Sequence, residues 1–461
     1  MKRDRTFETE IEKITPEGKG LCRIDGLVVF VKRAIPGEKV VLRLSKKKRS
    51  YAEAEIVEIL SPSPYRRSPF CPYFPLCGGC QWQHISYDAQ LRYKHELLYE
   101  ALNRAVGIDR DIILPIVDSP EEFHYRNKME FSFSNRVWNM QRKDRDDTEF
   151  ALGLHVSGTF YKVLDVEGCM LQSQIGDLIL RKVKEWVRKN RLSIYDIKRH
   201  EGSLRYLTLR YAMGCGKWMV VIVTKREESH SLRKLVGPLR DEIPSIHTVI
   251  NSINTRRANI AFGEREIPIF GDGHIQERIG RYTFRISSNS FFQTNFLNLK
   301  RLYDLILELS RLKGGEHVLD LYSGTGTISI YISEIAGHVL GIELEESAVK
   351  DAWENCKING VENCSFFKGD ILKILPHVRI SPDLVIMDPP RAGMHKRVIS
   401  MLRDMAPPVM LYVSCNPTTL SRDLSLLKED YAIELIQPID MFPQTHHVES
   451  IVCLVRKRKV K

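Results

Sequence analysis

The sequence predicts a multidomain protein with a small OB-like β-barrel, a central α+β domain and a C-terminal doubly wound α/β domain. Three observations lead to this prediction. The chain has 461 residues, which corresponds to roughly three domains. Short strand-like runs fill the first 60 residues, and strand and helix patterns begin to alternate near residue 285. The predicted domain boundaries are therefore 1–62, 63–284 and 285–461.

The N-terminal barrel is predicted from short apolar runs that are separated by Gly and Pro turns. Several short strands within about 60 residues are typical of a small antiparallel barrel of the OB type. A proline-containing stretch over 61–69 then interrupts regular structure and resembles a linker. The expected strands are Phe7–Ile14, Leu27–Val31, Val40–Leu44 and Ala52–Leu60.

The middle of the chain shows no alternation of strand and helix patterns, so an antiparallel sheet is expected there. A helix is predicted at about Tyr87–Ala105, where apolar residues recur at helical spacing. The expected strands are Lys128–Phe133, Ala151–His155, Leu207–Tyr211, Trp218–Val223 and Thr248–Ile253.

The last third of the chain begins with a predicted helix over Leu297–Leu309. Strand and helix patterns then alternate, which predicts a parallel, doubly wound sheet. The alternating segments are His317–Leu321, Thr327–Ile335, His338–Ile342, Ser347–Ile358, Ser365–Phe367, Leu384–Met387 and Met410–Val413.

The balance of charge indicates a polyanionic partner. The net charge is +11 and the pI is about 9.0, which favours nucleic acid, although solubility alone is the alternative. A basic cluster at 46–49 strengthens the first interpretation. The N-terminus lacks the apolar core of a signal peptide, and no apolar run reaches the roughly 18 residues of a membrane span. A cytoplasmic location without membrane attachment is expected.

A cofactor site is predicted where the apolar strand that begins at Val318 enters a turn with Gly324 and Gly326. Glycines let the backbone approach a ligand at a helix N-terminus, and an acidic residue such as Glu343 suits ribose hydroxyls. Asp370 follows the third strand and could meet an adenine amino group. Dinucleotide sites carry a third glycine, but position 329 is serine. The pattern therefore favours the adenosyl group of a methyl donor.

Two further strand ends carry reactive side chains. Asp388 and Arg391 follow one strand in an Asp-Pro-Pro-Arg run, and Cys415 ends the next. A thiolate that adds to carbon 6 of uracil makes carbon 5 nucleophilic, and a general base must later remove the carbon 5 proton. Glu449 is the candidate base, and Arg391 is the candidate for activating the thiol. The alternatives are a buried structural cysteine and a strand-edge carboxylate.

These motifs together resemble the RNA uracil-5-methyltransferase family. The resemblance implies that Cys415 is the nucleophile and Glu449 the base. It also implies that S-adenosylmethionine is bound by Gln293, Tyr322, Glu343 and Asp388, with Asp370 as an additional contact. The matching segments cover nearly the whole chain and are 291–295, 320–326, 388–393, 414–417 and 447–450.

A group of cysteines without an export signal indicates metal binding or catalysis rather than disulfides. Cys71, Cys77 and Cys80, together with Cys169, resemble the [4Fe–4S] ligand set of the same family. By their chemistry alone, four cysteines could equally hold structural zinc, and the resemblance favours the iron–sulfur cluster. The spacing of the cysteines excludes the radical enzymes that combine such a cluster with S-adenosylmethionine.

The N-terminal strands resemble the TRAM domain, an OB-like RNA-binding barrel. Family members with both a TRAM domain and a cluster typically act on large-subunit ribosomal RNA, so a uridine of 23S ribosomal RNA is the expected substrate. The target base would be flipped out of a loop. No obligate protein partner is implied. The alternatives are the same reaction on transfer RNA, an RNA-binding protein with a vestigial catalytic half, and a redox-sensing regulator.

Overall fold

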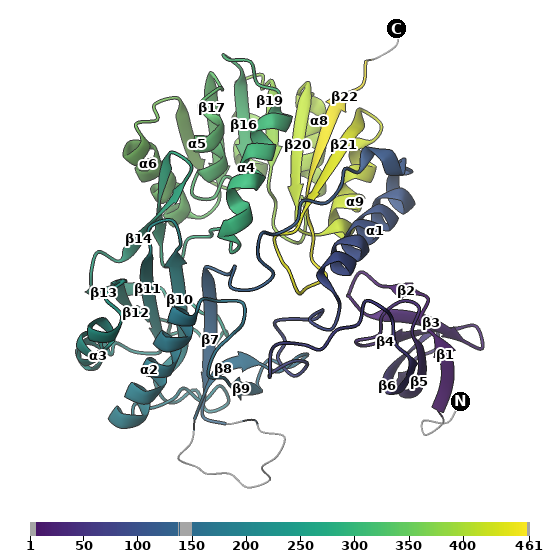
Figure 1. Cartoon of the computed structure of the whole chain (residues 1–461). Coiled ribbons are helices and arrows are strands. Elements are labelled where there is room, and N and C mark those ends of the chain that lie inside the picture. Colours follow the sequence, from purple (N-terminus) through teal and green to yellow (C-terminus); the bar gives the residue numbers. More distant parts are fainter. Residues whose placement is uncertain (1–5, 137, 139–149, 459–461) are drawn as a thin grey trace.

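The computed structural model describes residues 6–136, 138 and 150–458. Figure 1 shows three lobes: the N-terminal barrel in purple, a teal central lobe beside it, and a green and yellow lobe above both. Within the described residues, none of the helices is long and apolar enough to cross a bilayer.

The N-terminal lobe is a six-stranded sheet in the order β1-β5-β6-β4-β3-β2. Alternate residues of β5 point inward, with Val40, Leu42 and Leu44 buried in its core. This arrangement includes a strand at Gly20–Ile24 that the sequence pattern did not predict. The strands are β1 Thr6–Glu10, β2 Lys13–Ile14, β3 Gly20–Ile24, β4 Leu27–Val31, β5 Lys39–Lys47 and β6 Tyr51–Ser61.

Residues 62–86, between β6 and α1, contain Cys71, Cys77 and Cys80 and are called the cysteine segment. Helix α1, Tyr87–Val106, follows it and agrees with the predicted helix. It lies beside the upper lobe, where it contacts α9, and Leu98 and Leu102 join the core of that lobe. Lys94 is fully buried on α1 and forms an ion pair with Asp440 at 2.7 Å. The first half of the chain is therefore tied to the C-terminal lobe.

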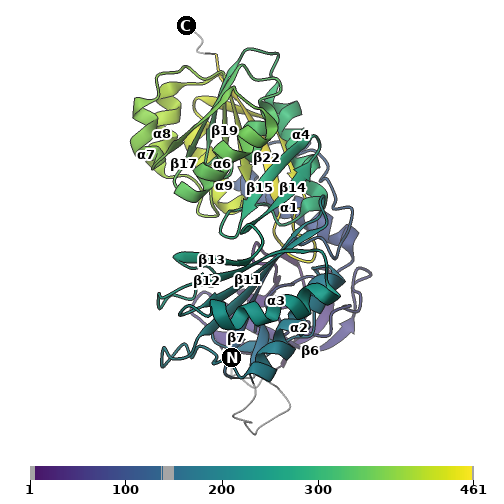
Figure 2. The same cartoon turned by 90° about the vertical axis from the view of Figure 1, so that its left-hand side faces the viewer.

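The central lobe contains a seven-stranded sheet in the order β13-β12-β11-β10-β7-β8-β9. Every neighbouring pair is antiparallel except β11 and β12, and helices α2 and α3 pack on the sheet (Figure 2). The elements are β7 Lys128–Ser134, β8 Ala151–His155, β9 Val163–Asp165, α2 Gln174–Asn190, β10 Leu204–Ala212, β11 Lys217–Thr224, α3 Ser229–Glu242, β12 Ile246–Ile253 and β13 Arg265–Phe270. A short 3₁₀ turn, η1, lies at Arg110–Ile112.

A two-stranded hairpin joins the central and upper lobes. Its strands are β14 His274–Ile279 and β15 Tyr282–Ser287. The backbone of Thr283 exchanges hydrogen bonds with the side chain of Asn359 on α6, at 2.8 and 2.7 Å. The hairpin therefore fixes the central lobe against the C-terminal one.

The C-terminal lobe is a seven-stranded sheet in the order β18-β17-β16-β19-β20-β22-β21. Apolar clusters lie on both faces of this sheet, as expected for a doubly wound fold. The strands are β16 His317–Leu321, β17 His338–Glu343, β18 Cys364–Lys368, β19 Leu384–Met387, β20 Val409–Ser414, β21 Tyr431–Ile439 and β22 Glu449–Arg456. The helices are α4 Phe296–Ser310, α5 Thr327–Ile332, α6 Glu346–Asn359, α7 Ile371–Ile374, η2 Leu375–His377, α8 Lys396–Met405 and α9 Pro417–Leu427.

The predicted parallel arrangement holds for the strands up to β20, and the sheet ends in an antiparallel edge. The first five strands are parallel, but β22 is antiparallel to both β20 and β21. The β21–β22 connection is short enough that the chain simply turns back, whereas a parallel strand would have needed a crossover helix. The antiparallel edge places the start of β22 beside the end of β20.

Candidate active site

The pairing of β20 with β22 brings Cys415 and Glu449 together. Ser414 is paired with Ser450 in this antiparallel ladder. Cys415 is the next residue after Ser414, and Glu449 is the residue before Ser450, so the register places them opposite one another. Glu449 is buried, with 2% of its surface exposed, whereas Cys415 is half-buried.

Asp388 and Arg391 approach the same place from the end of β19. The side-chain amide of Asn416 donates to the carbonyl of Arg391 at 3.0 Å, and the Thr419 hydroxyl donates to the same carbonyl at 3.2 Å. These bonds join the loop after β19 to the loop after β20. The four side chains predicted from separate strand ends therefore share one site at the carboxyl edge of the sheet.

The electrostatics of the site oppose the thiolate. Burial and, next, the carboxyl of Glu449 raise the pKa of Cys415 to about 11, and Arg391 acts in the opposite direction. Burial raises the pKa of Glu449, with Asp388 adding to the rise and Arg391 opposing it. Burial also raises the pKa of Asp388 to about 7. Arg391 therefore has the predicted effect on the thiol, but burial and the carboxyl groups outweigh it.

The turn after β16 has the shape that the glycine pattern predicted. Gly324 and Gly326 have φ values of 54° and 74°, and Tyr322 also lies in the left-handed region at 65°. The carboxylate of Glu343 accepts the backbone N–H of Gly324 and that of Glu345, both at 2.9 Å. Glu343 therefore braces this turn from the end of the next strand.

Two other predicted cofactor residues have structural contacts of their own. The carboxylate of Asp370 caps α7 by accepting the backbone N–H of Leu372 at 3.0 Å. The carbonyl of Gln293 accepts from the Asn127 side chain at 3.0 Å, and its own side chain is nearly buried. The segment with Gln293 is therefore held by Asn127, the residue before β7 of the central sheet.

The serine at position 329 explains why the third glycine is absent. Its hydroxyl donates to the buried carboxylate of Asp320, and burial raises the pKa of Asp320 to about 7. A Cβ at Gly326 would lie 2.8 Å from the ring of Phe366, so that glycine supplies the close packing. Sequence reasoning missed the Ser329–Asp320 pair, although the serine itself was visible.

The four grouped cysteines lie around one cavity of about 310 Å³. Arg126 also lines it and lowers the pKa of Cys80, which burial raises to about 12. The backbone N–H of Gly79 donates to the Cys77 sulfur at 3.4 Å. Over the described ranges, no three ligating side chains are grouped closely enough to hold a metal ion.

This cavity adjoins the cofactor segment. Phe292 and Thr294, on either side of Gln293, form part of its wall. The cysteines therefore lie close in space to one predicted cofactor residue, Gln293, from which they are remote in sequence.

Sequence reasoning assigned no role to the two histidines that precede the predicted base, although His447 lies in a matching segment. The rings of His446 and His447 lie 4.2 Å apart. Burial lowers the pKa of His446 to about 4 and that of His447 to about 3, so both are neutral at neutral pH. They consequently add no positive charge near Cys415.

Comparisons with known proteins agree with this geometry. The family model of tRNA (uracil-5-)-methyltransferases matches residues 86–370 and 376–457, and the TRAM domain model matches residues 2–57. A protein of Porphyromonas gingivalis described as an uncharacterized RNA methyltransferase is 40% identical, over 97% of this chain and 99% of its own. One of Chlorobaculum tepidum with the same description is 39% identical, over 96% of this chain and 92% of its own.

A solved structure is similar over almost the full length. It is that of Pyrococcus abyssi tRNA (uracil-54, C5)-methyltransferase in complex with S-adenosyl-L-homocysteine. The TM-score is 0.76 and the identity 29%, over 97% of this chain and 100% of that chain.

Proposed function

The chain belongs to the tRNA (uracil-5-)-methyltransferase family, and we propose that it methylates carbon 5 of a 23S ribosomal RNA uridine through a covalent bond from Cys415. It is an S-adenosylmethionine-dependent RNA methyltransferase with an N-terminal TRAM domain. The observation that supports the covalent route best is the β20–β22 register, which sets a cysteine opposite a buried carboxyl.

The proposed reaction begins at Cys415. The thiol first loses its proton to solvent, its sulfur then bonds to carbon 6 of the uracil, and the electron pair of the 5,6 double bond moves into an enolate. Carbon 5 then takes the methyl group, for which S-adenosylmethionine is the donor. Glu449 removes the remaining proton from carbon 5, the double bond re-forms, and the sulfur leaves carbon 6 with its electron pair.

The cofactor residues are proposed on the shape of the turn after β16. The backbone at Tyr322 and the carboxylate of Glu343 face this turn, where the helix N-terminus and the glycines allow close approach. Gln293 and Asp388 complete the proposed set from neighbouring loops. The assignment of Asp370 has the least support, because its carboxylate already caps helix α7.

A [4Fe–4S] cluster is proposed for the cavity lined by Cys71, Cys77, Cys80 and Cys169. In a cluster each cysteine binds a different iron, so the sulfurs lie farther apart than around one zinc ion. The proposal is supported by the family resemblance of the four cysteines and by their place around one cavity of about 310 Å³. A cluster would serve as a structural brace here, with Arg126 and the Gly79 N–H facing the thiolates.

The substrate assignment to 23S ribosomal RNA rests on the combination of TRAM domain and cysteine set. Transfer RNA is a second candidate, favoured by the similar Pyrococcus abyssi enzyme, whose name specifies uracil 54 of tRNA. Mapping 5-methyluridine in ribosomal and transfer RNA from a deletion strain separates the two. A site lost only from 23S ribosomal RNA supports the first candidate, and a site lost only from transfer RNA supports the second.

The covalent route is tested with two variants. Cys415→Ala should abolish both methylation and any protein–RNA adduct, because no sulfur is left to attack. Glu449→Gln should accumulate a denaturation-resistant adduct that carries the methyl group, because a general base contributes about 10²–10⁴-fold to the rate. RNA with 5-fluorouridine should trap the unmodified enzyme, since fluorine does not leave as a proton does. An adduct formed by Cys415→Ala would refute the nucleophile.

A further inference from the structure

The loop that leads into Glu449 contains a residue in an unusual conformation. Gln444, between β21 and β22, has φ of +66° and no exposed surface. Side chains other than glycine, asparagine and aspartate rarely adopt this left-handed backbone, and they keep it only when surrounding contacts hold them there. Contacts with the surroundings must therefore hold Gln444 in this conformation.

Every polar atom of Gln444 is hydrogen-bonded. With Gln90 of α1 it forms a two-way amide pair, at 2.9 Å through its backbone N–H and 3.1 Å through its side-chain oxygen. Its side-chain nitrogen donates to Glu122 at 2.9 Å, and its side-chain oxygen also accepts from Arg67 at 3.2 Å. Arg67 and Glu122 are themselves an ion pair at 2.6 Å.

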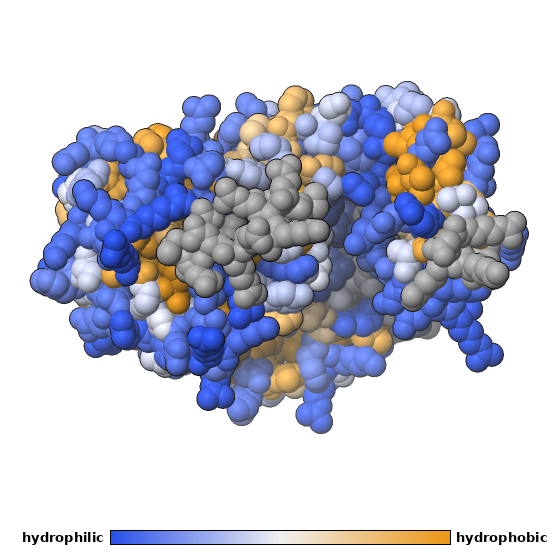
Figure 3. Space-filling model, turned by 90° about the horizontal axis from the view of Figure 1, so that it is seen from below, coloured by the Kyte–Doolittle hydropathy of each residue, from blue (hydrophilic) through white to orange (hydrophobic). Residues whose placement is uncertain are grey.

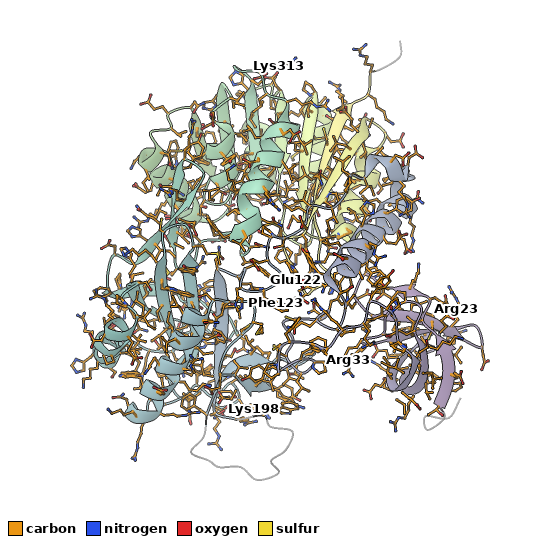
Figure 4. All side chains as sticks on the ribbon, in the orientation of Figure 1. Arg23, Arg33, Glu122, Phe123, Lys198 and Lys313 are labelled. Carbon is orange, nitrogen blue, oxygen red and sulfur yellow. The ribbon has the colours of Figure 1, made fainter. Side chains whose placement is uncertain are left out.

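The backbone of Gln444 is bonded to the cysteine segment. The N–H groups of Gln81 and Trp82, the two residues after Cys80, both donate to the carbonyl of Gln444 at 3.0 Å. The Trp82 indole in turn donates to the carbonyl of Gly18 in the N-terminal barrel at 3.1 Å. Figure 4 labels Glu122 and Phe123 in the middle of the molecule, where the lobes converge.

None of these partners belongs to the C-terminal sheet that carries Cys415. They come from the cysteine segment, α1 and the connection before β7. Glu122 lies 322 residues and Arg67 377 residues before Gln444 in the sequence. Local hydrogen bonds of Thr445 connect Gln444 to the stretch that leads to Glu449. The Thr445 hydroxyl donates to the carbonyl of Phe442 at 2.8 Å and accepts from the backbone of His447 at 3.2 Å.

We propose that Gln444 is a positioning residue for proton removal, through which the cysteine segment and α1 set the place of Glu449. The proposal rests on the proposed function of Glu449 and assigns Gln444 no contact with the substrate. The backbone of Cys415 is held by β20 of the C-terminal sheet, whereas release of product depends on the cysteine segment being folded against Gln444.

The test compares Gln444→Ala and Gln444→Gly with the unmodified enzyme, using full-length protein and unmodified RNA. Both variants lose the side-chain bonds to Gln90, Arg67 and Glu122, but glycine adopts the left-handed backbone without strain. We expect kcat to fall about 10²-fold in both, as for a misplacement near 1 Å, with KM for RNA unchanged. The methylated adduct, separated under denaturing conditions, should accumulate in both variants.

The adduct makes the test independent of partial unfolding, because only folded enzyme can attack and transfer the methyl group. Arg311→Ala is the matched control, since it removes an exposed ion pair with Glu434 on β21, the strand before the same loop. It should show unchanged kcat and no added adduct.

Two results would overturn the inference while leaving the proposed function intact. One is release of product at the normal rate by Gln444→Ala. The other is normal release by Gln444→Gly alone, which would assign the effect to backbone strain and not to the side-chain bonds. Failure of the unmodified enzyme to be trapped by 5-fluorouridine RNA would instead refute the covalent route itself.

Discussion

The protonation of Cys415 gives a quantitative prediction. Burial and the carboxyl of Glu449 raise its pKa to about 11. Compared with a free cysteine of pKa about 8.5, the thiolate fraction at neutral pH should be roughly 300-fold lower. In the enzyme without RNA, the thiol should therefore be unreactive at neutral pH. Its alkylation rate should rise about tenfold per pH unit well beyond pH 9, because the thiolate fraction grows in that proportion below the pKa.

The measurement is the rate of alkylation by iodoacetamide between about pH 6.5 and 10, the interval in which a free thiol titrates. Mass spectrometry of the peptide that contains Cys415 separates this residue from the other nine cysteines among the ten of the chain. N-acetylcysteine serves as the free-thiol reference. Glu449→Gln removes a charge that raises the pKa, so its rate at pH 8 should exceed that of the unmodified enzyme.

Arg391→Gln should have the opposite effect, because Arg391 lowers the pKa of the thiol. A rate that reaches a plateau near pH 8.5 would refute the reasoning, since it would mean that burial and the carboxyls leave the thiol unperturbed. Equal rates in the two charge variants would show that Glu449 and Arg391 are too far away to act.

Three other predictions follow from particular contacts. Gly326→Ala should weaken S-adenosylmethionine binding and lower the free energy of unfolding by roughly 1–3 kcal/mol, because the new Cβ would overlap Phe366. Calorimetry measures the binding and denaturant titration the stability. Unchanged stability would contradict the packing argument. Cys80→Ser should remove the absorption near about 400 nm of anaerobically purified protein; colourless unmodified protein with stoichiometric zinc would overturn the cluster. Replacing Lys46 and Lys47, both exposed on the barrel, should flatten the log–log salt dependence of RNA affinity by about 1.4–1.8 if both contact phosphate; an unchanged slope would mean that they are only solvated.

The underside of the molecule is consistent with an RNA-binding role for the barrel. Figure 3 shows mostly hydrophilic side chains there, with the surface hollowed between the barrel on the right and the central lobe.

Sequence patterns predicted the parts of the site that sit at strand ends. Asp388 and Cys415 each follow an apolar strand, and parallel neighbours end at the same edge of the sheet, so their proximity was predictable. The place of Glu449 was not, because it depends on the antiparallel register of β22 with β20. The direction of the Cys415 pKa shift was also out of reach, because it depends on burial and on two carboxyls, those of Glu449 and Asp388, from separate segments.

Gln444 was invisible to sequence reasoning for a different reason. Its left-handed backbone has no local cause such as glycine, and the groups that hold it lie hundreds of residues earlier in the chain. No periodicity or spacing within 440–449 indicates these partners. A residue whose role is to join two lobes becomes recognisable only when the lobes are placed together.

The two proposed catalytic side chains are therefore supported in different ways. Cys415 extends directly from β20, a strand in the interior of the sheet, whereas Glu449 follows a loop whose contacts come from the cysteine segment and α1. Damage to the N-terminal half that leaves the C-terminal sheet folded should consequently spare attack and impair release. In that case an enzyme with a disturbed cysteine segment would remain bound to its RNA, because elimination requires the proton that Glu449 removes.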